Sequence, residues 1–282
     1  MGVMYEDLGD VDNAVEEYKK VAKADTESSL VHLNLAAVYI KKNDLTKAIE
    51  ELNLSVKLDP EAVEPHAILA LVYSSQDKLD LAAAEYEMAL KNASKLQPKN
   101  ISIYKSLGVM YLRQRKFKDA ESVYKLIIDL SPADAEAHFY LGSIYNELNN
   151  NALSEKELKR AIELKPDYHE ALNFLGYLYV EASKNLLQAE AMIKKALELD
   201  PSNGAYVDSL GWLYFKKGKT DEAIKQLEKA VSLVEDPIIY DHLGDAYLKI
   251  KNNEKAKSNW QKSLNLDPDQ DTVKSKLEKL KK

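Results

Sequence analysis

Few side chains in this sequence have the types and spacing that catalysis requires. The chain has 282 residues and no Cys, which excludes disulfides, Cys-ligated zinc, iron–sulfur clusters and a thiol nucleophile. Gly218-Lys219-Thr220 resembles the end of a phosphate-binding loop, but that motif needs a Gly five residues earlier, where Leu213 stands. Asp267-Pro268-Asp269-Gln270-Asp271 resembles a calcium loop, but Thr272 replaces the Gly that such a loop needs. We interpret both segments as turns between helices.

Three histidines, His32, His66 and His138, occupy equivalent places in a repeating pattern. Two ligands of one zinc ion must both lie about 2 Å from it, and equivalent positions on neighbouring helices do not come that close. We therefore interpret these histidines as packing residues. No HExxH, GxSxG or Ser/His/Asp arrangement occurs in a recognisable context. The sequence predicts no catalytic residue, no metal site and no cofactor.

One acidic cluster could bind a cation or a Lys or Arg side chain. Asp241, His242 and Asp245 lie within five residues of one another, and Asp208 stands one repeat earlier. The alternative is a solvated acidic patch, which we favour because most carboxylates on helices are solvated.

The elements that position these residues follow from a repeat of about 34 residues. Gly108, Gly142, Gly176, Gly211 and Gly244 are spaced by 34, 34, 35 and 33 residues, and Gly2, Ala36 and Ala70 fill the same place earlier. A Leu precedes most of these small residues, a Tyr follows by three positions, and a second small residue, usually Ala, follows after 12 or 13. The Tyr column comprises Tyr5, Tyr39, Tyr73, Tyr111, Tyr145, Tyr179, Tyr214 and Tyr247.

This spacing predicts pairs of helices. Leu, the small residue and Tyr stand at i, i+1 and i+4, which is one face of a helix. A Gly inside a helix costs about 1 kcal/mol relative to Ala, so we expect each Gly to allow the close approach of a second helix. Polar stretches such as 41–44 and 216–219 join the first helix to the second, and endings such as Leu58-Asp59-Pro60 stop the second helix.

The pattern Leu-Gly-x-x-Tyr, then Ala, then a closing Pro resembles the tetratricopeptide repeat (TPR) over essentially the whole chain. The resemblance implies an all-α, right-handed superhelical solenoid of antiparallel helix pairs, and the last units are similar in style to bacterial TPR proteins. We place a partial unit at 1–28 and seven full units at 29–62, 63–100, 101–134, 135–168, 169–203, 204–236 and 237–270. Four extra residues in unit 63–100 predict a second helix about one turn longer, through Leu96.

The two ends of the chain differ from the other units. The first unit starts in mid-pattern, with Met1 in the place of the usual Leu, so we expect the chain to be part of a longer one. Residues 271–282 are expected to form a capping helix with an apolar face of Val273, Leu277 and Leu280. Its lysines, including Lys276, are expected on the opposite, outward face.

The TPR resemblance also implies that the first helices line a concave groove that faces a partner. Large aromatic side chains at the groove positions are the predicted anchors: Phe139, Tyr140, Phe174, Tyr177, Trp212 and Phe215. Asp208, Asp241 and Asp245 are the predicted charge partners. Seven acids against two bases at the groove positions of the last four units predict a basic partner segment with apolar anchors. Packing of the aromatic residues against neighbouring repeats, and solubility for the acids, are the alternatives.

The predicted function is a non-catalytic scaffold or adaptor that binds a protein or peptide in this groove. A chaperone-tail carboxylate clamp is absent, since of its required residues the chain has only Lys105, and Val109, Tyr140, Glu170 and Phe174 stand in the other places. One alternative is the targeting arm of a larger enzyme. Another is a self-assembling protein whose acidic residues 1–28 meet the basic residues 271–282 of a neighbouring copy.

The amino-acid composition limits the remaining classes of function. The net charge of −7 argues against nucleic-acid binding, which needs a basic surface. No apolar run approaches the ~20 residues of a membrane-spanning helix. The sequence is compatible with two compartments. These are the cytoplasm and, if a signal peptide lies upstream, the bacterial envelope or periplasm.

Overall fold

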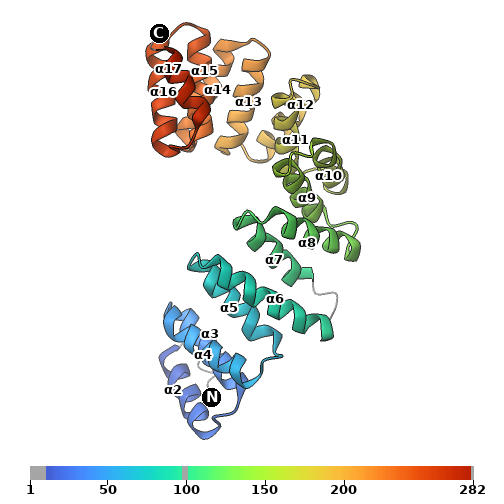
Figure 1. The fold of residues 1–282 in the computed structure, drawn as a ribbon, viewed down its shortest axis with the longest axis vertical. Coiled ribbons are helices and arrows are strands. Elements are labelled where there is room, and N and C mark those ends of the chain that lie inside the picture. The colour runs from blue at the N-terminus through green and yellow to red at the C-terminus, as the bar shows by residue number, and fades with distance from the viewer. Residues whose placement is uncertain (1–10, 97–100, 281–282) are drawn as a thin grey trace. The chain divides into compact units, whose positions relative to one another are not determined.

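The computed structural model describes residues 11–96 and 101–280, and all regular structure in these ranges is α-helical (Figure 1). The chain divides into two compact units, residues 1–150 and 151–282. The first unit contains α2 (Val11–Ala24), α3 (Ser29–Lys41), α4 (Leu45–Leu58), α5 (Val63–Ser75), α6 (Leu79–Leu96), α7 (Ile101–Arg113), α8 (Phe117–Leu130) and α9 (Ala135–Glu147). The second contains α10 (Asn151–Leu164), α11 (His169–Glu181), α12 (Leu186–Leu199), α13 (Gly204–Lys216), α14 (Thr220–Leu233), α15 (Pro237–Lys249), α16 (Asn253–Leu266) and α17 (Asp271–Leu280).

Consecutive helices pack as pairs within each unit. The pairs α3–α4, α5–α6 and α7–α8 are in contact in the first unit, as are α11–α12, α13–α14 and α15–α16 in the second. The first helices of successive pairs also touch, α11 with α13 and α13 with α15. The prediction of an all-α solenoid of helix pairs is confirmed. The predicted longer helix is also confirmed, because α6 has 18 residues where the second helices α4 and α8 have 14. The predicted start of the partial unit, residues 1–10, lies outside the described residues.

Each first helix ends in the same tight turn. One residue in the left-handed region recurs at the repeat interval: Asn43, Asp77, Arg115, Asn149, Ser183, Gly218 and Lys251. The next backbone N–H then donates to the carbonyl of the Tyr column, for example Lys219 to Tyr214 and Lys184 to Tyr179. This bond closes the helix end as in a Schellman-type cap. Gly218-Lys219-Thr220 is therefore a helix-to-helix turn, as expected.

Four glycines of the repeat lie against the second helix of their own pair: Gly108, Gly176, Gly211 and Gly244. A Cβ at Gly244 would lie 2.5 Å from the indole of Trp260, and one at Gly176 would lie 2.8 Å from Ile193. Real Cβ atoms do not come so close to a side chain, so the predicted close approach is confirmed at these positions.

Successive pairs are joined through acids on the second helices. Glu155 of α10 accepts hydrogen bonds from the Tyr179 hydroxyl of α11 at 2.9 Å and from Lys184 at 2.9 Å. Lys159 and Lys184 lower the pKa of Glu155 to about 2. Glu190 of α12 repeats the arrangement with Lys194 and Lys217, which lower its pKa to about 2. The Tyr column therefore links neighbouring repeats as well as filling space.

The three histidines of the repeat pack between helices. The ring Nδ1 of His32 lies 2.7 Å from Glu51, that of His66 lies 2.6 Å from Glu85, and Nε2 of the buried His138 lies 3.2 Å from the Pro132 carbonyl. Within residues 11–96 and 101–280, no group of three or more His, Asp or Glu side chains could hold a metal ion. The packing interpretation accounts for their positions.

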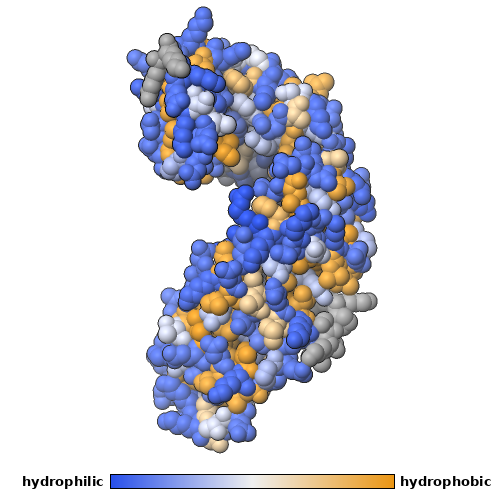
Figure 2. Space-filling model, in the orientation of Figure 1, coloured by the Kyte–Doolittle hydropathy of each residue, from blue (hydrophilic) through white to orange (hydrophobic). Residues whose placement is uncertain are grey.

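No helix among the described residues combines the length and apolarity that a bilayer span needs. Figure 2 shows hydrophilic residues over most of the visible face, with apolar residues in small groups between them.

Candidate protein-interaction site

An open pocket of about 630 Å³ lies over the first helices α11, α13 and α15 of the second unit. Its walls come from these helices and from the turns that precede α13 and α15. We call it the acidic pocket, and its lining comprises Asn173, Phe174, Tyr177, Asp200, Ser202, Asn203, Gly204, Ala205, Asp208, Ser209, Val234, Asp236, Ile238 and Ile239.

The lining combines carboxylates with exposed apolar surface. Three Asp line the pocket, and none of the described lining residues is Lys or Arg. Asp236 caps α15 by accepting from the backbone N–H of Ile238 at 2.7 Å. Ile238 is nevertheless 52% exposed and Val234 is 41% exposed. The pocket can therefore contact both an apolar side chain and a positive charge.

One polar atom of the lining lacks an intramolecular bond. The side-chain Oδ1 of Asn173 is buried and accepts no hydrogen bond from residues 11–96 or 101–280. An unsatisfied buried acceptor costs about 1–3 kcal/mol, so a donor that reached this atom would be stabilised.

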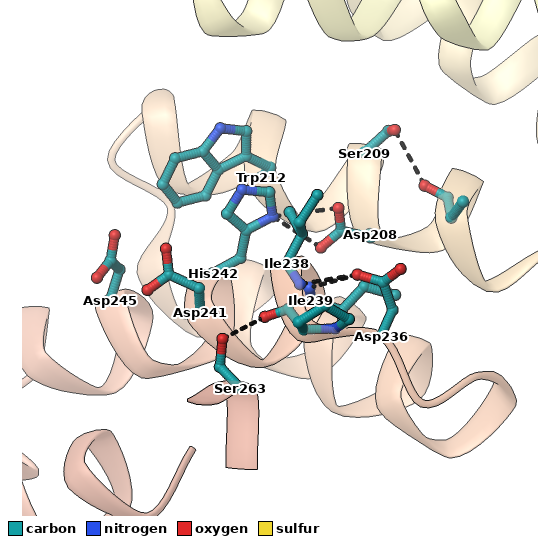
Figure 3. A network of polar contacts seen from close by, with 12 residues as sticks. Asp208, Ser209, Trp212, Asp236, Ile238, Ile239, Asp241, His242, Asp245 and Ser263 are labelled. Carbon is teal, nitrogen blue, oxygen red and sulfur yellow. Dashed lines mark hydrogen bonds and ion pairs between the residues drawn. The ribbon is translucent and has the colours of Figure 1, made fainter. Parts of the chain in front are cut away.

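Beside the pocket lies a buried cluster that joins α13 to α15 (Figure 3). His242 Nδ1 lies 2.9 and 3.1 Å from the two carboxylate oxygens of Asp208. The His242 ring stacks on Trp212 with 4.0 Å between centroids. The indole Nε1–H donates to Glu181 of α11, and Phe215 stacks on the indole at 4.8 Å. We call His242, Asp208, Trp212, Glu181 and Phe215 the Trp212 cluster.

The electrostatics of the cluster favour a protonated imidazole. Burial of the His242 ring opposes protonation, but the carboxylate of Asp208, helped by Asp241 and Glu181, outweighs it and raises the pKa of His242. Burial raises the pKa of the neighbouring Tyr177 hydroxyl, so this phenol stays neutral. Protonation of His242 thus creates a charge pair with Asp208 that is enclosed by aromatic rings.

The aromatic residues predicted as anchors take different positions. Phe174 and Tyr177 are half-buried and line the acidic pocket. Trp212 is only 7% exposed, which favours the packing alternative for this residue. Phe139 and Tyr140 lie on α9 of the first unit, where Tyr140 stacks on Tyr124 at 5.1 Å.

The acidic cluster of α15 holds a cation from its own chain. Lys276 Nζ of α17 lies 2.7 and 2.8 Å from the carboxylate of Asp241 and 2.8 Å from that of Asp245. The expectation that Lys276 faces outward is wrong, because this residue follows Val273 by three positions and so borders the buried apolar stripe. Neither a solvated patch nor an external cation describes these two acids.

The turn residues of the acidic pocket were missed from the sequence. Asp200, Val234 and Asp236 precede α13 or α15, whereas the TPR resemblance implies partner contacts only from the first helices. The pair Asp236-Pro237 indicates the start of α15 in the sequence, since Asp before a Pro is a common helix start.

Comparison with known proteins agrees with the fold. Tetratricopeptide repeat profiles match residues 6–72, 68–135, 106–169, 169–203, 208–236 and 238–270. The chain belongs to the tetratricopeptide repeat family, whose members act as protein–protein interaction scaffolds. A search of curated proteins finds no match.

Solved structures resemble the chain in fold. A TPR protein from Parabacteroides merdae superimposes with a TM-score of 0.72 at 20% identity, covering 95% of this chain and 100% of that one. The Cut9–Hcn1 hetero-tetramer of APC/C gives a TM-score of 0.70 at 19% identity, with 96% of this chain and 52% of that chain covered. YrrB, described as a TPR protein with an unusual peptide-binding site, gives 0.52 at 22% identity, with 72% and 99% covered.

Proposed function

We propose that the chain is a non-catalytic scaffold that binds a basic protein segment with a bulky apolar side chain in the acidic pocket. The observation that carries the proposal is the composition of this pocket: Asp200 and Asp236 with no Lys or Arg among the described lining residues, beside exposed Ile238 and Val234. The third lining carboxylate, Asp208, is already paired with His242. Exposed apolar groups in a concavity are the usual anchor sites of a partner. Opposite charge at the rim selects the partner and speeds its association.

The parts of the pocket have separate roles in this proposal. Phe174, Val234 and Ile238 receive the apolar side chain, while Asp200 and Asp236 attract a Lys or Arg. The Oδ1 atom of Asn173 accepts a backbone N–H of the bound segment, which would satisfy it. The occurrence of a peptide-binding site in YrrB supports peptide binding as a use of this fold.

The Trp212 cluster borders the pocket through Asp208, and its other members lie behind the lining. It connects α11, α13 and α15, the three helices that carry the lining, through Glu181, Trp212 and His242. We infer that it fixes the spacing of these helices, so Asp208 and Trp212 contribute to binding by holding the wall in place. The proposed charge-partner roles of Asp241 and Asp245 require displacement of Lys276, so the acidic pocket is the simpler site.

A pooled library of 12-residue peptides, each with two Lys or Arg and one Leu, Ile, Phe or Trp, tests the proposal. Members that bind the full chain are measured against Ile238→Ser, and Leu187→Ser is the matched control because Leu187 is 81% exposed on α12, away from the pocket. We expect Ile238→Ser to weaken binding about tenfold, because hot-spot truncation costs about 1–2 kcal/mol, and the control to change it less than twofold.

Three outcomes would overturn the proposal. The first is that no member of the basic library binds. The second is that Ile238→Ser and Leu187→Ser change the affinity equally. The third is that a matched acidic library binds as tightly and that Ile238→Ser weakens its binding. Circular dichroism of both variants separates loss of binding from loss of fold.

A further inference from the structure

A second pocket of about 590 Å³ lies where α15, α16 and α17 meet. Its apolar surface comes from Phe215, Leu248, Trp260 and Leu280, and Lys249, Lys251 and Lys279 stand around it. Asp245 and Lys276 also line it, but these two side chains are paired with each other at 2.8 Å. We call it the basic pocket.

The three outer lysines are free to bind. Lys249, Lys251 and Lys279 are exposed, and their ammonium groups make no hydrogen bond or ion pair within residues 11–96 and 101–280. Many other lysines of the second unit are paired, such as Lys184 and Lys194. Three unpaired positive charges therefore surround one apolar surface on a chain whose net charge is −7.

Helix ends alone do not account for this grouping. Lys249 and Lys279 stand in the last turns of α15 and α17, where a cation is favourable. Lys251, however, lies in the turn after α15. Its backbone is in the left-handed region, where Asn or Gly is better suited. Two separate segments, the end of α15 with its following turn and the end of α17, thus bring lysines to one pocket, next to Leu248, which is 40% exposed.

We propose that the basic pocket binds an acidic protein segment that carries a bulky apolar side chain. The apolar side chain would contact Leu248 and Leu280, and Asp or Glu residues beside it would pair with Lys249, Lys251 and Lys279. Charge complementarity selects this occupant, because a basic segment would meet three uncompensated lysines. The site differs in location and in charge from the acidic pocket, so it does not depend on the function proposed above.

Charge reversal tests the proposal with a matched control. A pooled library of 12-residue peptides, each with four Asp or Glu and one Leu, Ile, Phe or Trp, is screened against the full chain, and the binding members are titrated by fluorescence anisotropy. The triple variant Lys249→Glu, Lys251→Glu and Lys279→Glu is compared with Lys225→Glu, Lys229→Glu and Lys257→Glu. The control lysines are exposed on α14 and α16, and they change the net charge equally.

The expected results are specific to the pocket. The triple variant should bind at least about tenfold more weakly and the control less than threefold, with the difference shrinking as salt shortens the range of the charges. Leu248→Ser should also weaken binding, whereas Leu266→Ser, at a position 45% exposed on α16 outside the pocket, should not.

The proposal is overturned if no library member binds, if both triple variants lose binding equally, or if Leu248→Ser weakens the binding of a matched basic library as strongly as that of the acidic library. Ile238→Ser should leave binding of the acidic peptides unchanged, which separates this result from failure of the acidic pocket. Far-ultraviolet circular dichroism confirms that each variant is folded.

Discussion

The imidazole of His242 lies flat on the indole of Trp212, with ring planes 10° apart, while its Nδ1 contacts the Asp208 carboxylate. A protonated imidazole in this position is attracted both by the carboxylate and by the face of the indole. Asp208 and His242 are 5% and 6% exposed, so water does little to screen the pair. The contact ties α15 to α13 beneath the acidic pocket.

Removal of the indole should lower stability more than it lowers the affinity of the folded protein. Trp212→Ala is expected to lower the free energy of unfolding by about 3–5 kcal/mol, because it empties a packed site. Trp212→Phe, which keeps a ring against His242, should lose less. Urea denaturation followed by circular dichroism measures both, and full stability of Trp212→Ala would contradict the packing role.

Asp208→Asn tests what holds the charge on His242. The amide keeps an acceptor for the ring Nδ1–H but removes the negative charge, so the pKa of His242 should fall. Titration of the ring protons by nuclear magnetic resonance measures the pKa in both proteins. An unchanged pKa would show that Asp241 and Glu181 suffice.

The raised pKa of His242 also predicts a pH dependence of stability. The proton binds the folded state more tightly, so its stabilisation is complete below the ordinary His value of 6.5 and is lost as the pH rises through the higher folded pKa. The free energy of unfolding should therefore fall with pH above about 6.5 in the unmodified chain. His242→Asn should remove this part of the slope, and identical slopes in the two proteins would refute it.

Two buried serines should respond in opposite directions to replacement by Ala. Ser154 Oγ is buried in α10 without a hydrogen-bond partner in the described part of the chain, whereas Ser263 Oγ donates to the Pro237 carbonyl at 2.7 Å. Ser154→Ala should stabilise by about 0.5–1 kcal/mol, and Ser263→Ala should destabilise by about 1 kcal/mol. Thermal unfolding of the two variants measures the difference, and shifts of the same sign would contradict the assignment.

A methyl group at Gly244 should collide with the indole of Trp260. Gly244→Ala is expected to cost about 1–3 kcal/mol, because the new Cβ would lie 2.5 Å from ring atoms that cannot easily move. Trp260→Leu should reduce the additional cost of Gly244→Ala in the double variant. A double-mutant cycle in urea provides the test, and strictly additive effects would argue against the contact.

The regular part of the fold could be predicted from the sequence because it depends on local spacing. The intervals between glycines and tyrosines place the helix pairs, and the four extra residues before Gly108 predict the longer α6. The closeness of Gly176 to Ile193 follows from the same periodicity. The helix pair and its column of small residues recur along the chain, so each unit supports the interpretation of the others.

The irregular part depends on contacts that periodicity does not specify. Burial of Trp212 results from a histidine one repeat later and a glutamate one repeat earlier, and neither belongs to the repeat pattern. The pairing of Lys276 with Asp241 depends on how α17 packs at the end of the stack. The acidic pocket is also bordered by residues of the turns before α13 and α15.

The shared carboxylates of Glu155 and Glu190 affect how force would pass along the second unit. Glu155 accepts both a buried tyrosine hydroxyl and an exposed lysine from the next pair, so one side chain forms two links between neighbours. Tension along the stack would be concentrated at these carboxylates, and neutralising Glu155 would loosen both of its links together. Under tension, neighbouring helix pairs are thus expected to separate at these carboxylates, while the packing within each pair stays intact.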